Sequence, residues 1–345
     1  MNRLLALILL AAAVPLCAAQ PVPAPAARQA VDDAFVSASV ASLQSLIAQK
    51  YFDEPAIPRI NTALGAALQG GEFARARNLK EFADRLTAAL DRASHDEHLV
   101  VTVSAPASPA PDSTQMTRAE SFRLSNYGMK TAKILDGNVG YLEVTAFARA
   151  NEGSEAVDAA MRFLAHTDAI VLDLRVNGGG SPGTALQLLS YFFTQPDLPL
   201  FSIVSRSGDP TVERTLRDGI AWRDESRPVY VLVSARTWSA GEGVPFLLQE
   251  RHRARVFGEK TAGAANPAGP WPINDALTVT IPYGSIRSAL GGKNWDGTGV
   301  LPDTPVSPAK ALQAAYAQAL EELLARSPDA AHQHVLRYAL ANAGR

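Results

Sequence analysis

The chain has 345 residues, of which 47% are hydrophobic and 19% charged, and its formal net charge is −2. A chain of this length and composition can bury ordinary globular cores. It lacks the basic excess that is typical of nucleic-acid-binding proteins, so we expect no nucleic-acid partner.

Residues 1–19 have the pattern of a secretory signal peptide. A charged start is followed by an apolar run from Leu4 to Leu16 and by small residues, which predicts cleavage after residue 19 and a periplasmic or secreted mature protein. The run is short for a membrane helix, so we expect no stable membrane span. Lipidation of Cys17 is disfavoured because acceptor cysteines normally follow a small residue. Cleavage removes this only cysteine, which leaves neither a disulfide nor a thiol nucleophile.

Residues 20–30 are rich in Ala and Pro and are expected to be disordered. Beyond them, apolar residues recur at intervals of three and four in three successive stretches up to residue 94, which predicts three amphipathic helices. The stretches are separated by Pro55–Pro58 and Gly70-Gly71, which stop helices. With the β-branched run that follows, we interpret residues 31–103 as a small N-terminal helical domain.

Residues 104–118 are rich in Pro and Ala and are interpreted as a linker to a larger domain over residues 119–327. Strand and helix patterns alternate in that domain, which predicts an α/β fold with repeated β-β-α crossings. The predicted strands are 139–147, 169–175, 201–204, 229–233, 255–257 and 277–283, and the predicted helices are 155–164, 184–193 and 309–325. Residues 328–345 are expected to form a C-terminal helical tail.

Ser239 lies where a β-rich run, Pro228–Val233, gives way to a helical apolar face that begins near Val244. At a strand-to-helix junction the side chain is exposed, and the first N–H groups of the helix can stabilise a developing oxyanion. The alternative is an ordinary helix N-cap with Glu242 as its capping-box partner, and the motif alone favours the cap.

Four ordered motifs change that balance. They are DLRVNGGG at Asp173–Gly180, SAGE at Ser239–Glu242, GEKTAG at Gly258–Gly263 and GTGVLPD at Gly297–Asp303. Together they resemble the tail-specific (C-terminal processing) serine protease family over roughly residues 120 to 325. The resemblance implies a crotonase/ClpP-like ββα superhelix core. It also implies a serine peptidase that cleaves peptide or unfolded protein substrates through an acyl-enzyme, without metal or organic cofactor.

The base is implied by the branch of the family. In the branch with a Ser-Lys dyad the lysine follows the GExTxG segment, and that position is Ala264, while Lys260 is interpreted as a solvated lysine. The chain is more similar to the branch of the tricorn core protease and the interphotoreceptor retinoid-binding protein modules, whose histidine lies in a segment like Asp96–Leu99. This resemblance implies His98 as the base, with His95 as the runner-up.

The same branch implies the remaining site residues. An acidic residue near the GxGVxPD turn orients the histidine, and the matching residue is Asp296, one methylene shorter than the more usual glutamate. The N–H groups of Gly179 and Ala240 would form the oxyanion hole. The alternatives are a plain tight turn for the glycines and a half-buried structural histidine for His98. Asp173, Arg175 and Asn177 are expected to brace the glycine turn.

Two other functions stay open at this point. The branch includes carriers of retinoids, so a non-catalytic module for an apolar ligand is possible on the same architecture. A crotonase-like lyase or hydratase that acts on a thioester would share the core and the oxyanion hole but would not require Ser239.

Overall fold

The computed structural model describes residues 31–104, 118–206 and 208–343. The chain from Val31 onward forms one compact unit. The expected signal peptide (1–19), the expected disordered segment (20–30) and almost all of the expected linker (104–118) lie outside the described residues. Within the described ranges, none of the helices combines the length and the apolar character needed to span a membrane.

The three predicted N-terminal helices are present as α1 (Asp33–Lys50), α2 (Ile57–Gln69) and α3 (Leu79–Ser94). Their ends follow from local chemistry, because the Asp32 carboxylate accepts the N–H of Phe35 at the start of α1 and Asn78 caps α3 in the same way. Short 3-10 turns lie between them at Glu54–Ala56 (η1) and Phe73–Arg75 (η2).

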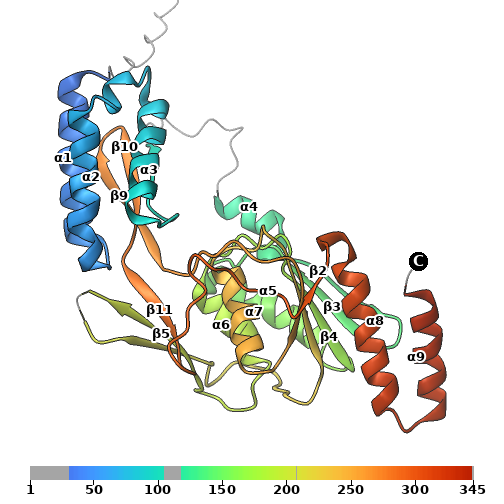
Figure 1. The fold of residues 1–345 in the computed structure, drawn as a ribbon. Helices are drawn as coiled ribbons and strands as arrows, with labels where there is room; N and C mark the ends of the chain where they lie inside the picture. The colour runs from blue at the N-terminus through green and yellow to red at the C-terminus, as the bar shows by residue number, and fades with distance from the viewer. Residues whose placement is uncertain (1–30, 105–117, 207, 344–345) are drawn as a thin grey trace, which may run out of the picture. The chain divides into compact units, whose positions relative to one another are not determined.

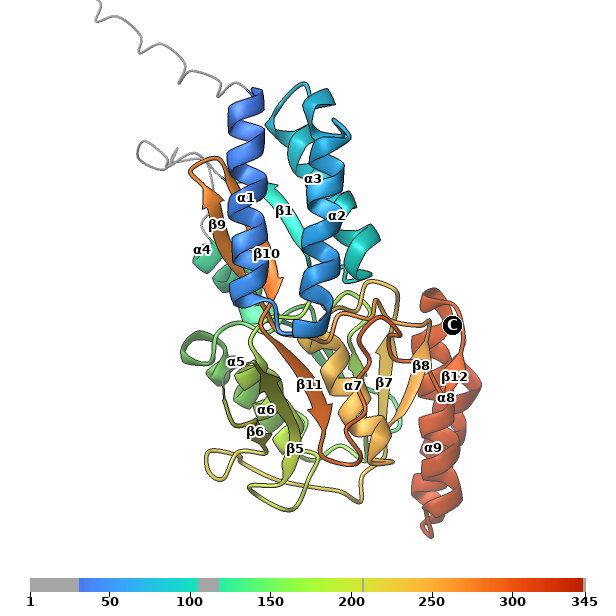
Figure 2. The same cartoon turned by 60° about the vertical axis from the view of Figure 1, so that its left-hand side comes forward.

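The helices pack on a three-stranded antiparallel sheet with the order β1-β10-β9, and we call this assembly the N-terminal layer. Its strands are β1 (Val100–Val103), β9 (Ala268–Asn274) and β10 (Leu277–Pro282). Leu277, Val279 and Ile281 are fully buried with the apolar faces of α1 and α3. A hairpin from late in the chain therefore completes the core of the first helices (Figures 1 and 2).

The main sheet has the order β12-β8-β7-β4-β3-β2, with β2 antiparallel to β3 and the other neighbours parallel. Its strands are β2 (Met129–Leu135), β3 (Val139–Val144), β4 (Ala169–Asp173), β7 (Val229–Val233), β8 (Arg255–Gly258) and β12 (Thr304–Pro305). All residues of β7 are buried, and they alternate between two cores: Val231 faces one, whereas Tyr230 and Leu232 face the other. Both faces of the sheet are therefore covered, as in other α/β folds.

One face of this sheet packs against α5 (Ala150–Phe163), α6 (Pro182–Ser190) and α7 (Ala240–Glu250), and the opposite face against α8 (Pro308–Arg326) and α9 (Ala330–Asn342) (Figure 1). A third sheet has the order β11-β5-β6, from β5 (Pro199–Ser205), β6 (Thr211–Arg214) and β11 (Gly284–Ser288). The segment before β2 contains α4 (Arg118–Leu124) and η3 (Asn126–Gly128). The predicted α/β class with a preceding helical region is confirmed.

The topology brings two turns together. The strands β4 and β7 are parallel neighbours, so their carboxyl ends lie at the same edge of the sheet. The turn after β4 carries the three glycines, and the turn after β7 carries Ser239. Ligands of open α/β sheets commonly bind at this edge.

Candidate active site

Ser239 directly precedes the first residue of α7 and has a positive φ of 54°, with ψ of −123°. An ordinary N-cap has an extended backbone, and a non-glycine residue held at positive φ costs on the order of 1–3 kcal/mol. The Glu242 carboxylate accepts the Ser239 N–H at 2.8 Å, which is one half of a capping box. The cap contact is therefore present in a strained turn, a combination typical of functional sites.

Glu242 is fully buried and gathers the neighbouring loop around the serine turn. Besides the Ser239 N–H, its carboxylate accepts the Thr261 hydroxyl at 2.5 Å and the N–H groups of Gly263 and Ala264 at 2.6 and 2.9 Å. A buried carboxylate is stabilised when several donors satisfy its oxygens. Glu242 thus fixes the GEKTAG loop against the start of α7.

The glycine turn lies against the serine turn. A Cβ atom on Gly179 would lie 2.9 Å from the Ser239 Cβ and from the Trp238 carbonyl oxygen, so only glycine permits this approach. The buried Asn177 side chain joins the glycine turn to β3, because it donates to the Val144 carbonyl at 3.0 Å and accepts the Gly179 N–H at 2.8 Å. The Asn177 carbonyl accepts the Trp238 N–H of the serine turn at 2.9 Å. The expected bracing role of Asn177 is present in this geometry.

These contacts decide which N–H groups are free. The Gly179 N–H is already used by Asn177, whereas the N–H groups of Gly180 and Ala240 meet no hydrogen-bond acceptor within residues 31–104, 118–206 and 208–343. Gly180 and Ala240 line the same pocket as Ser239. The expected Gly179 N–H therefore has a partner, whereas those of Gly180 and Ala240 are left without one at the pocket among the described residues.

His98 lines this pocket as well, just before β1, and its side chain is 10% exposed. Its Nδ1 atom lies 2.9 Å from Asp96 Oδ1 and 3.9 Å from Asp296 Oδ1. Only the first distance is that of a hydrogen bond. The Asp296 carboxylate instead accepts the N–H groups of Ala265 and Asn266 at 2.9 and 3.2 Å. The structure thus places Asp96, and not the expected Asp296, at the ring nitrogen of His98.

Asp96 and His98 modify each other's proton affinity. Burial opposes charge on both groups, but the hydrogen bond and charge of Asp96, with the charges of Asp296 and Glu242, raise the pKa of His98 above its ordinary value. Burial likewise raises the pKa of Asp96, but hydrogen bonds from His98 and Tyr51 outweigh it, so the net pKa is lowered. Asp96 is therefore a carboxylate at neutral pH, and a hydrogen on Nδ1 leaves Nε2 of His98 as an acceptor.

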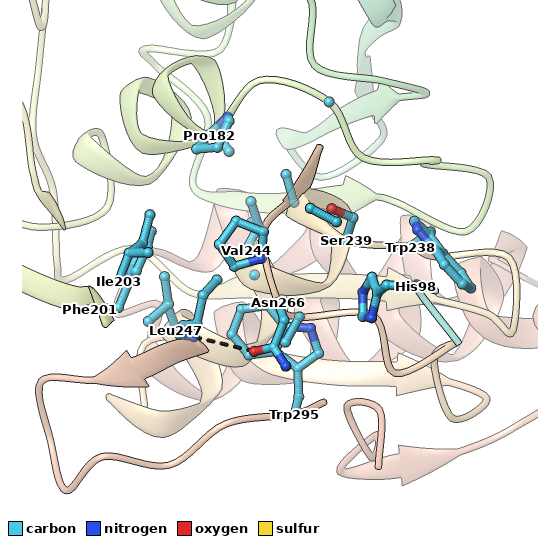
Figure 3. A pocket seen from close by; sticks show the side chains of 18 of the residues that line it. His98, Pro182, Phe201, Ile203, Trp238, Ser239, Val244, Leu247, Asn266 and Trp295 are labelled. Atoms are coloured by element: carbon cyan, nitrogen blue, oxygen red, sulfur yellow. Dashed lines mark hydrogen bonds between the residues drawn. The ribbon is translucent and has the colours of Figure 1, made fainter. Parts of the chain in front are cut away.

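Figure 3 shows Ser239, Trp238 and His98 at one end of the pocket, with Phe201, Ile203 and Leu247 at the other. The pocket has a volume of about 430 Å³. Most of its remaining wall is apolar and comes from α6, α7, β11 and the loop between β11 and β12: Leu186, Leu189, Val244, Ile286 and Trp295. No hydrogen bond joins Ser239 to His98 here, but catalytic hydrogen bonds are often long before substrate binds.

The other candidate bases lie elsewhere. Lys260 is exposed and His95 is an exposed C-cap of α3, and neither lines the pocket. Ala264 is buried, with its N–H on Glu242. In the part of the chain that the structure describes, no group of three or more His, Cys, Asp or Glu side chains is arranged to hold a metal ion.

Two protein-family models match the chain. A model of peptidase family S41 matches residues 138–306, which include both turns of the site. A model for the N-terminal domain of that family in eukaryotic IRBP matches residues 33–127, which include His98. The chain belongs to peptidase family S41. The suspected family and branch are thereby confirmed.

Curated S41 relatives are carboxyl-terminal processing proteases. The chain is 28% identical over 170 residues to carboxyl-terminal-processing peptidase 2, chloroplastic, of Arabidopsis thaliana, a match that covers 49% of this chain and 32% of the relative. It is 30% identical over 145 residues to the carboxyl-terminal-processing protease of Synechocystis, which covers 42% of this chain and 32% of the relative. The match thus spans about a third of each relative's length.

Solved structures share the fold. A lipoprotein from Streptococcus agalactiae superposes with a TM-score of 0.57 at 14% identity and covers 83% of this chain and 96% of its own. The tricorn protease gives a TM-score of 0.51 at 11% identity and covers 90% of this chain and 37% of its own. At these identities the likeness concerns the S41 fold alone.

Three contacts of the site do not follow from the motifs. The Asp96 side chain forms an Asx turn with the His98 N–H at 3.0 Å, a signal that an aspartate two residues before a histidine carries in the sequence. The Gly179 N–H donates to Asn177, whose buried side chain the motif alone does not orient. Glu242 accepts donors from the GEKTAG loop as well as the Ser239 N–H expected of a cap partner.

Proposed function

We propose that this S41 chain hydrolyses peptide bonds by nucleophilic catalysis at Ser239. The Ser239 hydroxyl attacks the scissile carbonyl carbon while His98 Nε2 takes the hydroxyl proton. The oxyanion that forms accepts hydrogen bonds from the Gly180 and Ala240 N–H groups. The imidazolium then returns the proton to the departing amine, and water hydrolyses the acyl-enzyme by the same route.

Asp96 is proposed as the carboxylate that orients His98. The observation that carries the proposal is the strained Ser239 turn with a histidine in the same pocket, whose Nδ1 is held by a buried carboxylate at 2.9 Å. This bond fixes the ring tautomer and stabilises the imidazolium that forms after proton transfer. Asp296, which was expected in this role, is proposed to hold the loop at Ala265 and Asn266.

The pocket supports peptide or unfolded protein substrates with an apolar side chain beside the cleaved bond. Its wall beyond Ser239 is mostly apolar, with Leu, Ile, Val, Phe and Trp side chains. Burying an apolar side chain there contributes about 1.5–3 kcal/mol, whereas a charged one would lose hydration without a partner. Peptides with Leu at this position should be cleaved at least about 10-fold faster than those with Asp, measured as kcat/KM.

Digestion of a denatured protein by the full chain tests the activity, with cleavage sites mapped by mass spectrometry. We expect cleavage by the parent and none by Ser239→Ala or His98→Ala. Lys260→Ala is the matched control for a lysine base and should cleave normally. Equal cleavage by the parent and Ser239→Ala, or loss of cleavage in Lys260→Ala, would contradict the assignment.

Export and the alternative function are tested separately. We propose that residues 1–19 direct export, and N-terminal sequencing of protein recovered outside the cytoplasm should begin at Gln20; an intact Met1 there would refute this.

A carrier of an apolar ligand is not favoured, because the curated relatives are proteases. Such a carrier would bind retinol equally well before and after Ser239→Ala and would cleave nothing.

A further inference from the structure

We propose that Tyr51, the C-cap residue that follows α1, is a positioning residue for His98 and acts on it through Asp96. The proposal rests on the proposed function of His98 as a base. It extends the site from the α/β core into the N-terminal layer, so that Tyr51, Asp96, His98 and Ser239 form one relay.

The two oxygens of Asp96 have separate partners. Oδ1 accepts both the backbone N–H and the Nδ1 of His98, at 3.0 and 2.9 Å. Oδ2 accepts the Tyr51 hydroxyl at 2.9 Å. A carboxylate that is held on both oxygens cannot rotate about its terminal torsion, so the Tyr51 contact fixes the direction in which Oδ1 faces His98.

Tyr51 is itself held in place. Its side chain is 3% exposed, and its N–H donates to the Ile47 carbonyl at 3.1 Å to close the last turn of α1. The next residue, Phe52, donates its N–H to the Pro282 carbonyl at the end of β10 at 3.2 Å. The hydroxyl therefore reaches Asp96 from a fixed backbone, with little conformational entropy left to lose.

The surrounding charges keep the proton on the Tyr51 hydroxyl and favour the protonated form of His98. Burial, the charge of Asp96 and the weaker charges of Asp53 and Asp296 raise the pKa of Tyr51 well above its ordinary value, so it stays a donor. Asp96, Asp296 and Glu242 are the carboxylates that act on His98. The Tyr51 hydroxyl donates to Asp96 and thereby reduces the negative charge that the carboxylate presents to His98. If the hydroxyl is removed, the attraction between the Asp96 carboxylate and the His98 imidazolium becomes stronger.

Tyr51→Phe tests the relay because it removes only the hydroxyl. We expect the pKa of His98, measured by NMR titration of its ring nitrogens, to rise by about half a unit, since part of one hydrogen bond is transmitted. We expect kcat to fall roughly 10-fold with KM unchanged, by analogy with partners that orient metal ligands. The NMR arm needs no peptidase activity, so it decides the proposal even if the proposed function fails.

Tyr230→Phe is the matched control, because Tyr230 is a buried tyrosine that donates to the Glu322 carboxylate at 2.6 Å away from the pocket. It should change neither the His98 pKa nor kcat.

In the Asp96→Asn background, adding Tyr51→Phe should have no further effect, as expected for a residue that acts through Asp96. An unchanged His98 pKa in Tyr51→Phe, an equal change in Tyr230→Phe, or full additivity with Asp96→Asn would overturn the proposal. If Tyr51→Phe does not fold, Tyr51→Met, which also lacks a donor and adapts to the shape of a buried site, must raise the His98 pKa instead, and an unchanged value there overturns the proposal too.

Discussion

At the scale of single residues, two aspartates lie near His98, and their distances from its Nδ1 atom differ by one ångström. His98 Nδ1 is 2.9 Å from Asp96 and 3.9 Å from Asp296. The motif resemblance implies Asp296 in this role, but the Asp296 carboxylate accepts the N–H groups of Ala265 and Asn266. Asp96 reaches the ring because the Asx turn folds it back onto His98.

Exchanging each aspartate for asparagine separates their roles. Asp96→Asn should lower kcat by about 10²–10⁴-fold, because the ring loses the acceptor that fixes its tautomer. Asp296→Asn should lower kcat by less than about 10-fold, through the loop at Ala265 and Asn266. Steady-state kinetics on one fluorogenic peptide measures both, and a larger loss in Asp296→Asn would reverse the assignment.

The raised pKa of His98 predicts the pH dependence. His98 must be neutral to accept the Ser239 proton, so activity is present above its pKa and is lost as the pH falls through it. The acid limb of kcat/KM should therefore lie above the ordinary histidine value of about 6.5. It should move to lower pH in Asp96→Asn, because the charge that stabilises the imidazolium is removed. An acid limb that stays in place would show that Asp96 does not act on the titrating group.

At the scale of elements, the glycine turn after β4 is held by close backbone packing. Gly180 has a φ of 132°, and a Cβ there would lie 2.1 Å from the Phe147 carbonyl oxygen, whereas a Cβ on Gly178 would meet no atom within 4 Å. Gly180→Ala should lower the free energy of unfolding by about 3 kcal/mol and abolish cleavage. Gly178→Ala should change the free energy of unfolding and the cleavage rate little. Urea denaturation and peptide assays measure these two quantities, and equal effects of the two substitutions would contradict the turn geometry.

Elements with a strong pattern were predicted well, and those without one were missed. The buried run Val229–Val233 and the helix over residues 309–325 agree with β7 and α8 within a few residues. β9 contains Pro270 and Pro272, which read as a loop but are tolerated on an edge strand. Its pairing with β10, and the pairing of β10 with β1, depend on contacts that no local pattern carries.

At the scale of the whole molecule, the N-terminal layer and the α/β core share chain segments. The proposed boundary at residues 104–118 divides the sequence, but β1 pairs with β10 across it, from Val100 with Thr280 to Val103 with Leu277. The turn between α3 and β1 also brings His98 to the pocket of Ser239, with Asp96 bonded to its Nδ1. A fragment that begins after residue 118 would therefore lack His98 and the helices α1–α3 that cover one face of the β9–β10 hairpin.

Limited trypsin digestion tests this integration. The sequence predicts the first cut at Arg118, at the end of the Pro- and Ala-rich segment. We expect the two fragments to co-elute in gel filtration under native conditions, because α1–α3 and the hairpin share one apolar core. Fragments that separate after this cut, or a first cut between residues 139 and 175, would contradict the arrangement.

The central claim is that Ser239 is a nucleophile activated by His98, and covalent labelling with a fluorophosphonate tests it most directly. The serine oxygen displaces fluoride from phosphorus, so a reactive serine acquires a stable mass that peptide mapping can locate. We predict one adduct, on Ser239, with labelling lost in Ser239→Ala, reduced at least about 100-fold in rate in His98→Ala and unchanged in Lys260→Ala. Labelling of another residue, or equal labelling rates in the parent and His98→Ala, would contradict the account.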